Sequence, residues 1–518
     1  MSDTAFSDLD WHRMHPVTPV LNAWKTIVGL FVIALWQLSP RITAEGGLPA
    51  GRALIAVVGV LLFAGIIGAV YAAFAWRVTR YALDDERVYH QSGVLFRRQR
   101  QARLDRVQAV DVIQPLFARL FGFAQLKVEQ AGGSGSNVVL SYLKEDDAQE
   151  LRNEILARAA GLGVGPQVES AGGLVPPPPP PPGGGAGLPP SPGGGAGVPP
   201  PARAVRAPGS RPARLAPEAP EREVVSVPVN RLVGSIALSG TTFMLLLSAV
   251  FLVVVSFTSE ARGSIGGIFV IVIGGASYVW GRFTGEFAFR AAISPDGVRL
   301  RHGLTESRAQ TVPPGRVQAI RLVQPLLWRI PGWWRVRINV AGYGATEVNK
   351  ESVLLPVGTL DEALLAVWLV LPDLGEPDPR AVLVAGLQGS GEDGGFTASP
   401  RRARWLDPIA WRRNGVRVTP AGLLLRSGRL VRQLDLVPHE RTQSIGLVQG
   451  PLERKLGLSS FVVHSTPGPV TPRVRHLDTA VAADLLMVQS GRARSARASA
   501  GPERWMSRPG GHEAPPLP

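Results

Sequence analysis

Cysteine is absent from the 518 residues, and lysine is scarce, with 5 lysines against 50 arginines. The lack of cysteine excludes disulfides, thiolate-bound zinc and a thiol nucleophile. The formal net charge is +15. However, the basic residues do not alternate with aromatic ones as in single-strand binders, and no helix-turn-helix or zinc-finger spacing occurs. We therefore interpret the arginine excess as a compositional bias and expect no nucleic-acid partner.

Patterns typical of active sites and metal sites are also lacking. His12 and His15 are three positions apart, but no further histidine or acidic residue completes a metal site beside them. The run GLGVGP at 161–166 has neither the preceding strand nor the following helix that a dinucleotide loop requires. No Walker lysine or nucleophile elbow is present. The sequence therefore predicts no enzyme activity, no catalytic residues, no cofactor and no metal.

Long apolar segments are present instead. Four of them carry no charged residue: Thr26–Leu38, Ala53–Trp76, Leu232–Phe257 and Ser264–Trp280. About 20 apolar residues span a bilayer, and shorter segments can be accommodated by bilayer thinning. The segments pair into two predicted transmembrane hairpins, at 23–76 and 222–280. Arginines follow the first hairpin closely, which by the positive-inside rule places that side in the cytoplasm.

A ten-residue phrase occurs three times, as RVQAVDVIQP at 106–115, RVQAIRLVQP at 316–325 and RTQSIGLVQG at 441–450. Two glycines, two arginines and two glutamines keep the same spacing in every copy without a gap. These repeat residues are Gly93, Arg106, Gln108, Gln114, Arg119, Gly122, Gly303, Arg316, Gln318, Gln324, Arg329, Gly332, Gly428, Arg441, Gln443, Gln449, Arg454 and Gly457. The copies lie too far apart for stacked repeats and predict three whole domains.

Each copy has the pattern of a small α+β module. Val336, Ile338 and Val340 alternate with polar residues, which is the period of a half-buried strand. Helical patterns close the copies at Asp146–Ala159, Thr359–Leu371 and Asp478–Ser490. Several antiparallel strands followed by one helix are therefore expected in each module.

Two stretches carry a family resemblance. Residues 81–132, YALDDERVYHQSGVLFRRQRQARLDRVQAVDVIQPLFARLFGFAQLKVEQAG, resemble the bacterial PH-like domain of the YdbS/YdbT membrane-protein family, and HERTQSIGLVQGPLERKLGL at 439–458 is similar to the same family phrase. The resemblance implies a bent antiparallel sheet with a C-terminal helix, acting as a membrane-associated binding or scaffolding module. The third copy departs from the pattern, because no apolar hairpin precedes it and Gly450 replaces the proline of the other two.

The expected fold class is thus a polytopic α-helical membrane protein with two transmembrane hairpins and three small PH-like domains. The predicted division is a cytoplasmic N-terminus at 1–22, hairpin 1 at 23–76, PH-like domain 1 at 77–160, a Pro/Gly-rich linker at 161–221, hairpin 2 at 222–280, PH-like domain 2 at 281–375, a linker at 376–404, PH-like domain 3 at 405–490 and a disordered basic tail at 491–518. The proline run Pro176–Pro182 is either a spacer or a ligand for an aromatic groove.

The predicted function is a membrane-anchored scaffold or binding protein at the cytoplasmic face of the cell membrane. Its expected partners are the bilayer and an unidentified membrane or cytoplasmic protein. The alternative is an accessory subunit of a membrane enzyme or transporter, for example in envelope maintenance. We interpret the repeat residues as fold support, since glycine suits positive φ; the alternative is that the repeat arginines hold lipid phosphates. Arg97, Arg98, Arg100 and Arg103 are the predicted contacts to anionic lipid.

Overall fold

The computed structural model describes separate helical positions between 55 and 78 and the ranges 11–13, 79–84, 87–93, 98–104, 107–130, 138–159, 222–258, 264–294, 297–312, 314–341 and 352–499. The first apolar segment of hairpin 1, Thr26–Leu38, and most of the N-terminal 22 residues fall outside these residues, whereas the described positions of the second segment, Ala53–Trp76, are helical. The predicted linker at 161–221 and the tail from residue 500 onward fall wholly outside them.

Each repeat copy folds as two groups of strands followed by a helix. In the first copy these are β1 (His12–Arg13), β2 (Arg80–Leu83), β3 (Arg87–Ser92), β4 (Arg98–Arg103), then β5 (Val107–Pro115), β6 (Phe123–Gln130), β7 (Val138–Lys144) and α4 (Glu145–Ala159). A short helix, α3 (Leu116–Leu120), joins β5 to β6.

The second copy follows the same plan with β8 (Arg222–Ser226), β9 (Arg290–Ser294), β10 (Gly297–His302), β11 (Glu306–Val312), then β12 (Val317–Gln324), β13 (Trp334–Val340), β14 (Val353–Gly358) and α8 (Leu360–Val370). The third comprises β15 (Thr397–Ala398), β16 (Gly415–Val418), β17 (Gly422–Ser427), β18 (Arg432–Pro438), then β19 (Ser444–Val448), β20 (Leu458–His464), β21 (Arg473–Asp478) and α11 (Thr479–Ser499).

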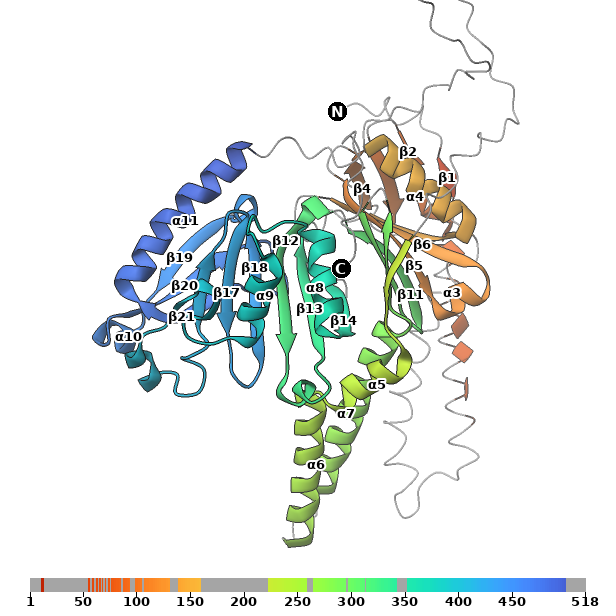
Figure 1. Ribbon diagram of the computed structural model, residues 1–518. Helices are drawn as coiled ribbons and strands as arrows, with labels where there is room; N and C mark the ends of the chain where they lie inside the picture. Colours follow the sequence, from red (N-terminus) through yellow and green to blue (C-terminus); the bar gives the residue numbers. More distant parts are fainter. Residues whose placement is uncertain are drawn as a thin grey trace, which may run out of the picture.

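The sheets do not coincide with the modules. The second half of module 1 and the first half of module 2 form one seven-stranded sheet, in the order β7-β6-β5-β11-β10-β9-β8. Modules 2 and 3 share another, β14-β13-β12-β18-β17-β16-β15. Both junctions are antiparallel, β5 with β11 and β12 with β18, and Figure 1 shows these strands side by side. A four-stranded sheet, β1-β2-β3-β4, and a three-stranded sheet, β19-β20-β21, remain at the two ends.

Burial explains why the repeat phrase is so apolar. Strand β12 lies in the middle of a sheet with both faces covered, and its Val317, Ile320 and Leu322 are at most 3% exposed. A strand buried on both faces reads as an almost continuous hydrophobic run rather than as an alternation. The closing helix α8 begins with a complete capping box between Thr359 and Glu362, as the sequence pattern predicts.

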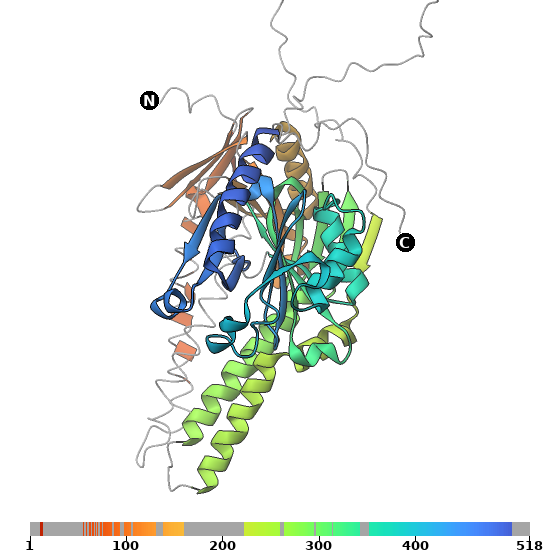
Figure 2. The same cartoon turned by 60° about the vertical axis from the view of Figure 1, so that its left-hand side comes forward.

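The helices of the second apolar region are inserted between β8 and β9. They are α5 (Val229–Ala237), α6 (Gly240–Thr258) and α7 (Ser264–Glu286). Helices α6 and α7 pack against each other and project from the body as a pair (Figures 1 and 2). The expected hairpin at 222–280 therefore begins too early, since β8 belongs to a sheet, and ends too soon, since α7 continues to Glu286.

The expected fold class, a polytopic α-helical membrane protein, is wrong. The described chain is organised around antiparallel sheets. Over that part of the chain, no single helix is both long and apolar enough to cross a membrane, and only α5 and α6 together have the length and composition, across a 49° bend. The error came from counting apolar residues alone. Such a count does not detect the bend between α5 and α6, nor that the strands β8 and β9 flank the helices.

Two predicted boundaries also need correction. The expected linker at 376–404 contains α9 (Pro379–Gln388), whose Val382, Leu383 and Leu387 are buried in the main core. Its Gly/Ser-rich composition concealed this, because α9 is ordered by contacts with the distant strands β17 and β18. The expected tail at 491–518 is helical as far as Ser499, where α11 ends.

Candidate cavity at the base of the projecting helices

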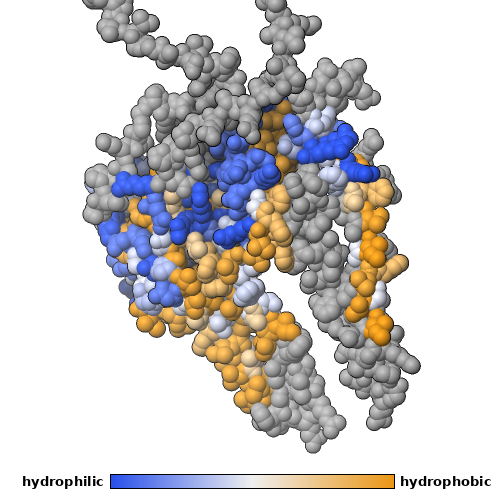
Figure 3. All heavy atoms as spheres, turned by 90° about the vertical axis from the view of Figure 1, so that its right-hand side faces the viewer, coloured by the Kyte–Doolittle hydropathy of each residue, from blue (hydrophilic) through white to orange (hydrophobic). Residues whose placement is uncertain are grey.

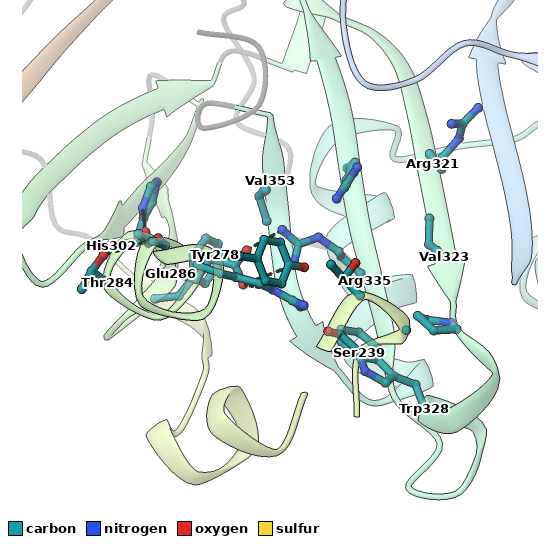
Figure 4. Close-up of a pocket in the computed structure, with 18 of the residues that line it drawn as sticks. Ser239, Tyr278, Thr284, Glu286, His302, Arg321, Val323, Trp328, Arg335 and Val353 are labelled. Atoms are coloured by element: carbon teal, nitrogen blue, oxygen red, sulfur yellow. Dashed lines mark hydrogen bonds and ion pairs between the residues drawn. The ribbon is translucent and has the colours of Figure 1, made fainter. Parts of the chain in front are cut away.

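A cavity of about 890 Å³ lies where α6 and α7 meet the body of module 2. The turn before α6 contributes Ser239, the last turns of α7 contribute Tyr278 and Glu286, and strands β10 to β13 supply the opposite wall. Figure 4 shows these side chains around the opening. The lining thus joins the end of an apolar helix pair to a polar sheet face.

Arginines dominate the charge of this cavity. Five lining residues are arginines, Arg282, Arg308, Arg321, Arg335 and Arg337, whereas two are carboxylates, Glu286 and Glu306. Closely placed guanidinium groups favour planar anions, which they can bind through two hydrogen bonds. The lining therefore carries an excess of positive charge.

Part of this charge is neutralised internally. Arg335 forms an ion pair with Glu286 at 2.5 Å, and Arg282 lies 3.6 Å from the same carboxylate. Burial alone would raise the pKa of Glu286, but the Arg335 guanidinium outweighs it and holds the pKa below its usual value. Arg321 binds Asp435 with two hydrogen bonds of 2.6 and 2.7 Å. These pairs orient the arginines but leave the cavity positive overall.

Arg337 differs from its neighbours. Among the described residues, no hydrogen bond or ion pair is recorded for its side chain, and its buried Nε has no partner. Burial, and next the Arg335 guanidinium, lower the pKa of Arg337 to about 10. The group therefore stays charged at neutral pH, and an anion entering the cavity would find this guanidinium available.

Aromatic and imidazole groups complete the wall. Trp328 is 1% exposed, donates its indole N–H to Ser235 O at 3.0 Å, and lies under Arg282 at 5.6 Å. His302 Nδ1 lies 2.7 Å from Gly285 O, and burial lowers the pKa of His302. His302 is thus neutral at pH 7 and adds no charge to the cavity.

The six repeat glycines all have positive φ, between 62° and 111°. Gly93, Gly303 and Gly428 turn the chain into the last strand of each first half, and a Cβ at Gly303 or Gly428 would overlap a backbone carbonyl oxygen. Gly122, Gly332 and Gly457 end the short helical turn before the next strand. These positions need glycine for the backbone conformation.

The described repeat glutamines and arginines do not converge on one site. Gln318 and Gln324 are buried in β12, and Gln324 accepts a hydrogen bond from Arg432 at 3.1 Å. Arg329 donates to Leu430 O of the following module at 3.2 Å. Gln114 is half-buried, whereas Arg119 and Arg454 are exposed. Arg106 lies outside the described residues, as does the side chain of Gln108, and Arg316 and Arg441 are half-buried.

In module 3, one of the two repeat glutamines is hydrogen-bonded within the fold and the other is exposed. The Gln449 side chain donates to Leu458 O at 2.9 Å and lies 3.3 Å from the hydroxyls of Ser459 and Thr479, whereas Gln443 is exposed. Gln449→Ala should lower the free energy of unfolding by roughly 1–3 kcal/mol, because it leaves buried acceptors unsatisfied. Gln443→Ala should have little effect. Urea unfolding of the two variants checks this, and equal stabilities would contradict it.

The predicted anionic-lipid contacts lie mainly on β4. Arg98, Arg100 and Arg103 belong to this strand, and the side chains of Arg100 and Arg103 are exposed, whereas Arg97 lies outside the described residues. Arg100 and Arg103 do not line the cavity. Sequence reasoning missed the cavity arginines, although one signal was available: Arg282 and Glu286 are the first charges after an apolar run.

Comparisons with known proteins agree with this architecture. The family model described as "Bacterial PH domain" matches residues 29–159, 242–365 and 381–490. A curated relative, the UPF0699 transmembrane protein YdbT of Bacillus subtilis (strain 168), is 22% identical over 157 residues, which are 29% of this chain and 30% of the relative. The chain thus matches less than a third of that relative's length. No solved structure matches. With three matches that together cover most of its length, this chain belongs to the bacterial PH domain family and is a YdbS/YdbT-like member of it.

Proposed function

We propose that the chain is a membrane-associated scaffold without catalysis of its own, which acts at the cytoplasmic face of the cell membrane. In this proposal the projecting α6–α7 pair contacts the bilayer and the cavity at its base binds an anionic lipid headgroup. A protein partner assembled on the PH-like modules is part of the same proposal. The name of the Bacillus relative, a transmembrane protein, supports membrane association.

The observation that carries the proposal is the apolar surface beside the basic cavity. Large apolar side chains of α6 are strongly exposed, among them Leu246 at 65% and Phe251 at 65%, and Trp280 of α7 is 60% exposed. In Figure 3 the described part of the projecting helices is largely orange, with hydrophilic residues above it. Large contiguous apolar surfaces of this kind mark sites of interaction with membranes or other proteins.

The arrangement matches the chemistry of a membrane interface. A bilayer places phosphates directly above its hydrocarbon, and here arginines lie directly above apolar helices. Arginine binds phosphate through paired hydrogen bonds, and Trp280 lies near the same boundary, where tryptophan is enriched. The two features together favour a phospholipid over a soluble anion.

Replacing two exposed apolar residues tests the role of the helix pair. Leu246→Asp with Phe251→Asp should move the chain from membrane pellets to the supernatant after gentle lysis, because charged groups in the bilayer cost about 2.5 kcal/mol or more each. Leu246→Ala with Phe251→Ala is the matched control and should stay with the membrane. Equal membrane fractions for the Asp and Ala variants would contradict the proposal.

Loss of one guanidinium tests the cavity. Arg337→Gln should reduce the difference in binding between vesicles of anionic and zwitterionic lipid by roughly tenfold, since a charge-assisted hydrogen bond contributes about 1.5–3 kcal/mol. Arg473→Gln removes an equal charge from the exposed face of β21 and serves as the control. Similar vesicle binding by both variants would show that charge alone, rather than the cavity, attracts the chain to lipid. Binding of free inorganic phosphate to the cavity, without a preference for vesicles, would favour a soluble anion instead.

A further inference from the structure

Modules 1 and 3 each have one edge strand of the kind that pairs at the two junctions between modules. The strand that begins the second half of a module, β5 or β12, pairs with the strand that ends the first half of the next module, β11 or β18. In the third module the strand corresponding to β5 and β12 is β19. In the first module the strand corresponding to β11 and β18 is β4. Both are the terminal strands of their sheets in the described chain.

The two inner junctions have the same register. Positions are counted from the arginine that opens each repeat phrase, which is Arg106, Arg316 or Arg441. The residue seven positions after this arginine in one module pairs with the residue eight positions before it in the next module: Ile113 with Arg308, and Val323 with Gln433. A register conserved between two junctions of different sequence shows that the backbone geometry of the module itself defines the pairing. The modules therefore carry a directional, head-to-tail interface.

Side chains of the terminal strands are more exposed than those of the strands that pair at the junctions. Val112 of β5 and Ile320 of β12 are at most 2% exposed, whereas Leu447 and Val448 of β19 are 37% and 51% exposed. On the other edge, Gln99 and Gln101 of β4 are exposed. An edge strand that presents apolar side chains is a template for pairing with another chain. Within the described chain β4 and β19 do not pair with each other, since each is the end strand of a separate sheet.

We propose that a second copy of this chain pairs its β4 with β19, continuing across molecules the sheet that joins the modules within one molecule. The register rule then places Val448 opposite Arg98 and Leu447 opposite Gln99 of the neighbouring copy. The interface is heterologous, because two different edges meet. Such contacts produce a ring when the rotation closes and a filament when it does not.

The absence of cysteine makes the register directly testable. Full-length chains carrying only Leu447→Cys are mixed with chains carrying only Gln99→Cys, in detergent or in native membranes, and oxidised. The expected product is a covalent dimer and nothing larger, because each chain offers one reactive end. One chain carrying both substitutions should give a ladder of higher oligomers, or a closed ring.

The controls separate this pairing from other contacts. Ser444→Cys with Gln99→Cys shifts the pair by three positions and places the thiols on opposite faces of the sheet, so little crosslinking is expected. A covalent dimer from Leu447→Cys chains alone would show symmetric β19–β19 pairing and overturn the proposal. Absence of crosslinks in all combinations would overturn it as well.

Charge reversal supplies a second measurement. The predicted partner strand, RQRQAR, is basic, so Val448→Arg should weaken self-association and Val448→Glu should not. The two variants replace the same apolar residue with charged groups, and their dissociation constants should differ by roughly tenfold, the effect of opposed versus like cross-strand charges. Light scattering of the separated oligomers measures this. A monomer at every concentration for the unsubstituted chain, or equal values for the two variants, would count against the proposal.

Discussion

Asp435→Ala should destabilise the junction of modules 2 and 3 by about 3–5 kcal/mol, the usual cost of leaving one partner of a buried ion pair unpaired. Asp435 lies on β18 and is 2% exposed. Its carboxylate accepts two hydrogen bonds from Arg321 on β12, and the two residues face each other directly in the sheet register. The pair therefore links two modules at the centre of their shared sheet.

The remaining contacts of Arg321 explain why the loss should be large. The same guanidinium donates to Thr471 O at 2.9 Å and Pro469 O at 3.3 Å, so it is held in place even when the carboxylate is gone. Burial lowers the pKa of Arg321, and in the unsubstituted chain Asp435 outweighs this effect. The variant loses that contribution, but an arginine side chain still keeps its charge at neutral pH. Asp435→Ala therefore leaves a fixed cation without its counter-charge.

Pulse proteolysis in urea, following fragments that contain β18, measures this effect. Asp361→Ala removes the carboxylate of an exposed ion pair with Arg380 and should change stability little. Arg321→Met combined with Asp435→Leu should recover much of the loss, because an apolar pair carries no desolvation cost. A stability of the Asp435→Ala variant equal to that of Asp361→Ala would contradict the assigned role.

Arg413→Ala and Arg426→Ala should each release the 376–404 segment from the body. Arg413 donates to the last carbonyls around α9, with Gly389 O at 2.6 Å and Leu387 O at 3.1 Å. Arg426 is 0% exposed, donates to Arg413 O at 3.0 Å and stacks on Phe396 at 4.5 Å. Cations at a helix C-terminus satisfy its orphan carbonyls.

The expected cost for either arginine is about 3 kcal/mol, since two or more buried acceptors lose their donor at roughly 1–3 kcal/mol each. Hydrogen exchange should show faster exchange confined to α9 and the following residues, together with new protease cleavage in the same segment. Arg412→Ala is the matched control, because the neighbouring Arg412 only lies over the Trp411 ring. Unchanged exchange in both Arg413→Ala and Arg426→Ala would show that apolar burial of α9 alone orders this segment.

The sequence defined the repeat unit closely because its signals are local. Positive φ requires glycine at fixed positions such as Gly303 and Gly428, and a capping box marks the start of α8. Apolar periodicity located the strands and closing helices for the same reason. Family membership also followed from these local patterns.

The division into sheets could not be read in the same way. Strand pairing joins residues far apart in the chain, such as Arg321 and Asp435, and nothing local to β12 indicates whether its neighbour comes from its own module or the next. The expected linker at 376–404 illustrates the same limit, because the arginines that order it lie on or just before strands β16 and β17. The cavity depends on this arrangement too, since Arg335 and Glu286 meet only when α7 and β13 are brought together.

The sequence by itself therefore determined the modules, their turns, their closing helices and the apolar character of α6 and α7. Only the tertiary structure decided that neighbouring modules share sheets, that α9 is folded, and that arginines gather at the base of the projecting helices. The physical reason is the range of the interactions: backbone conformation and side-chain periodicity act within a few residues, whereas sheet register and ion pairing depend on which distant segments meet.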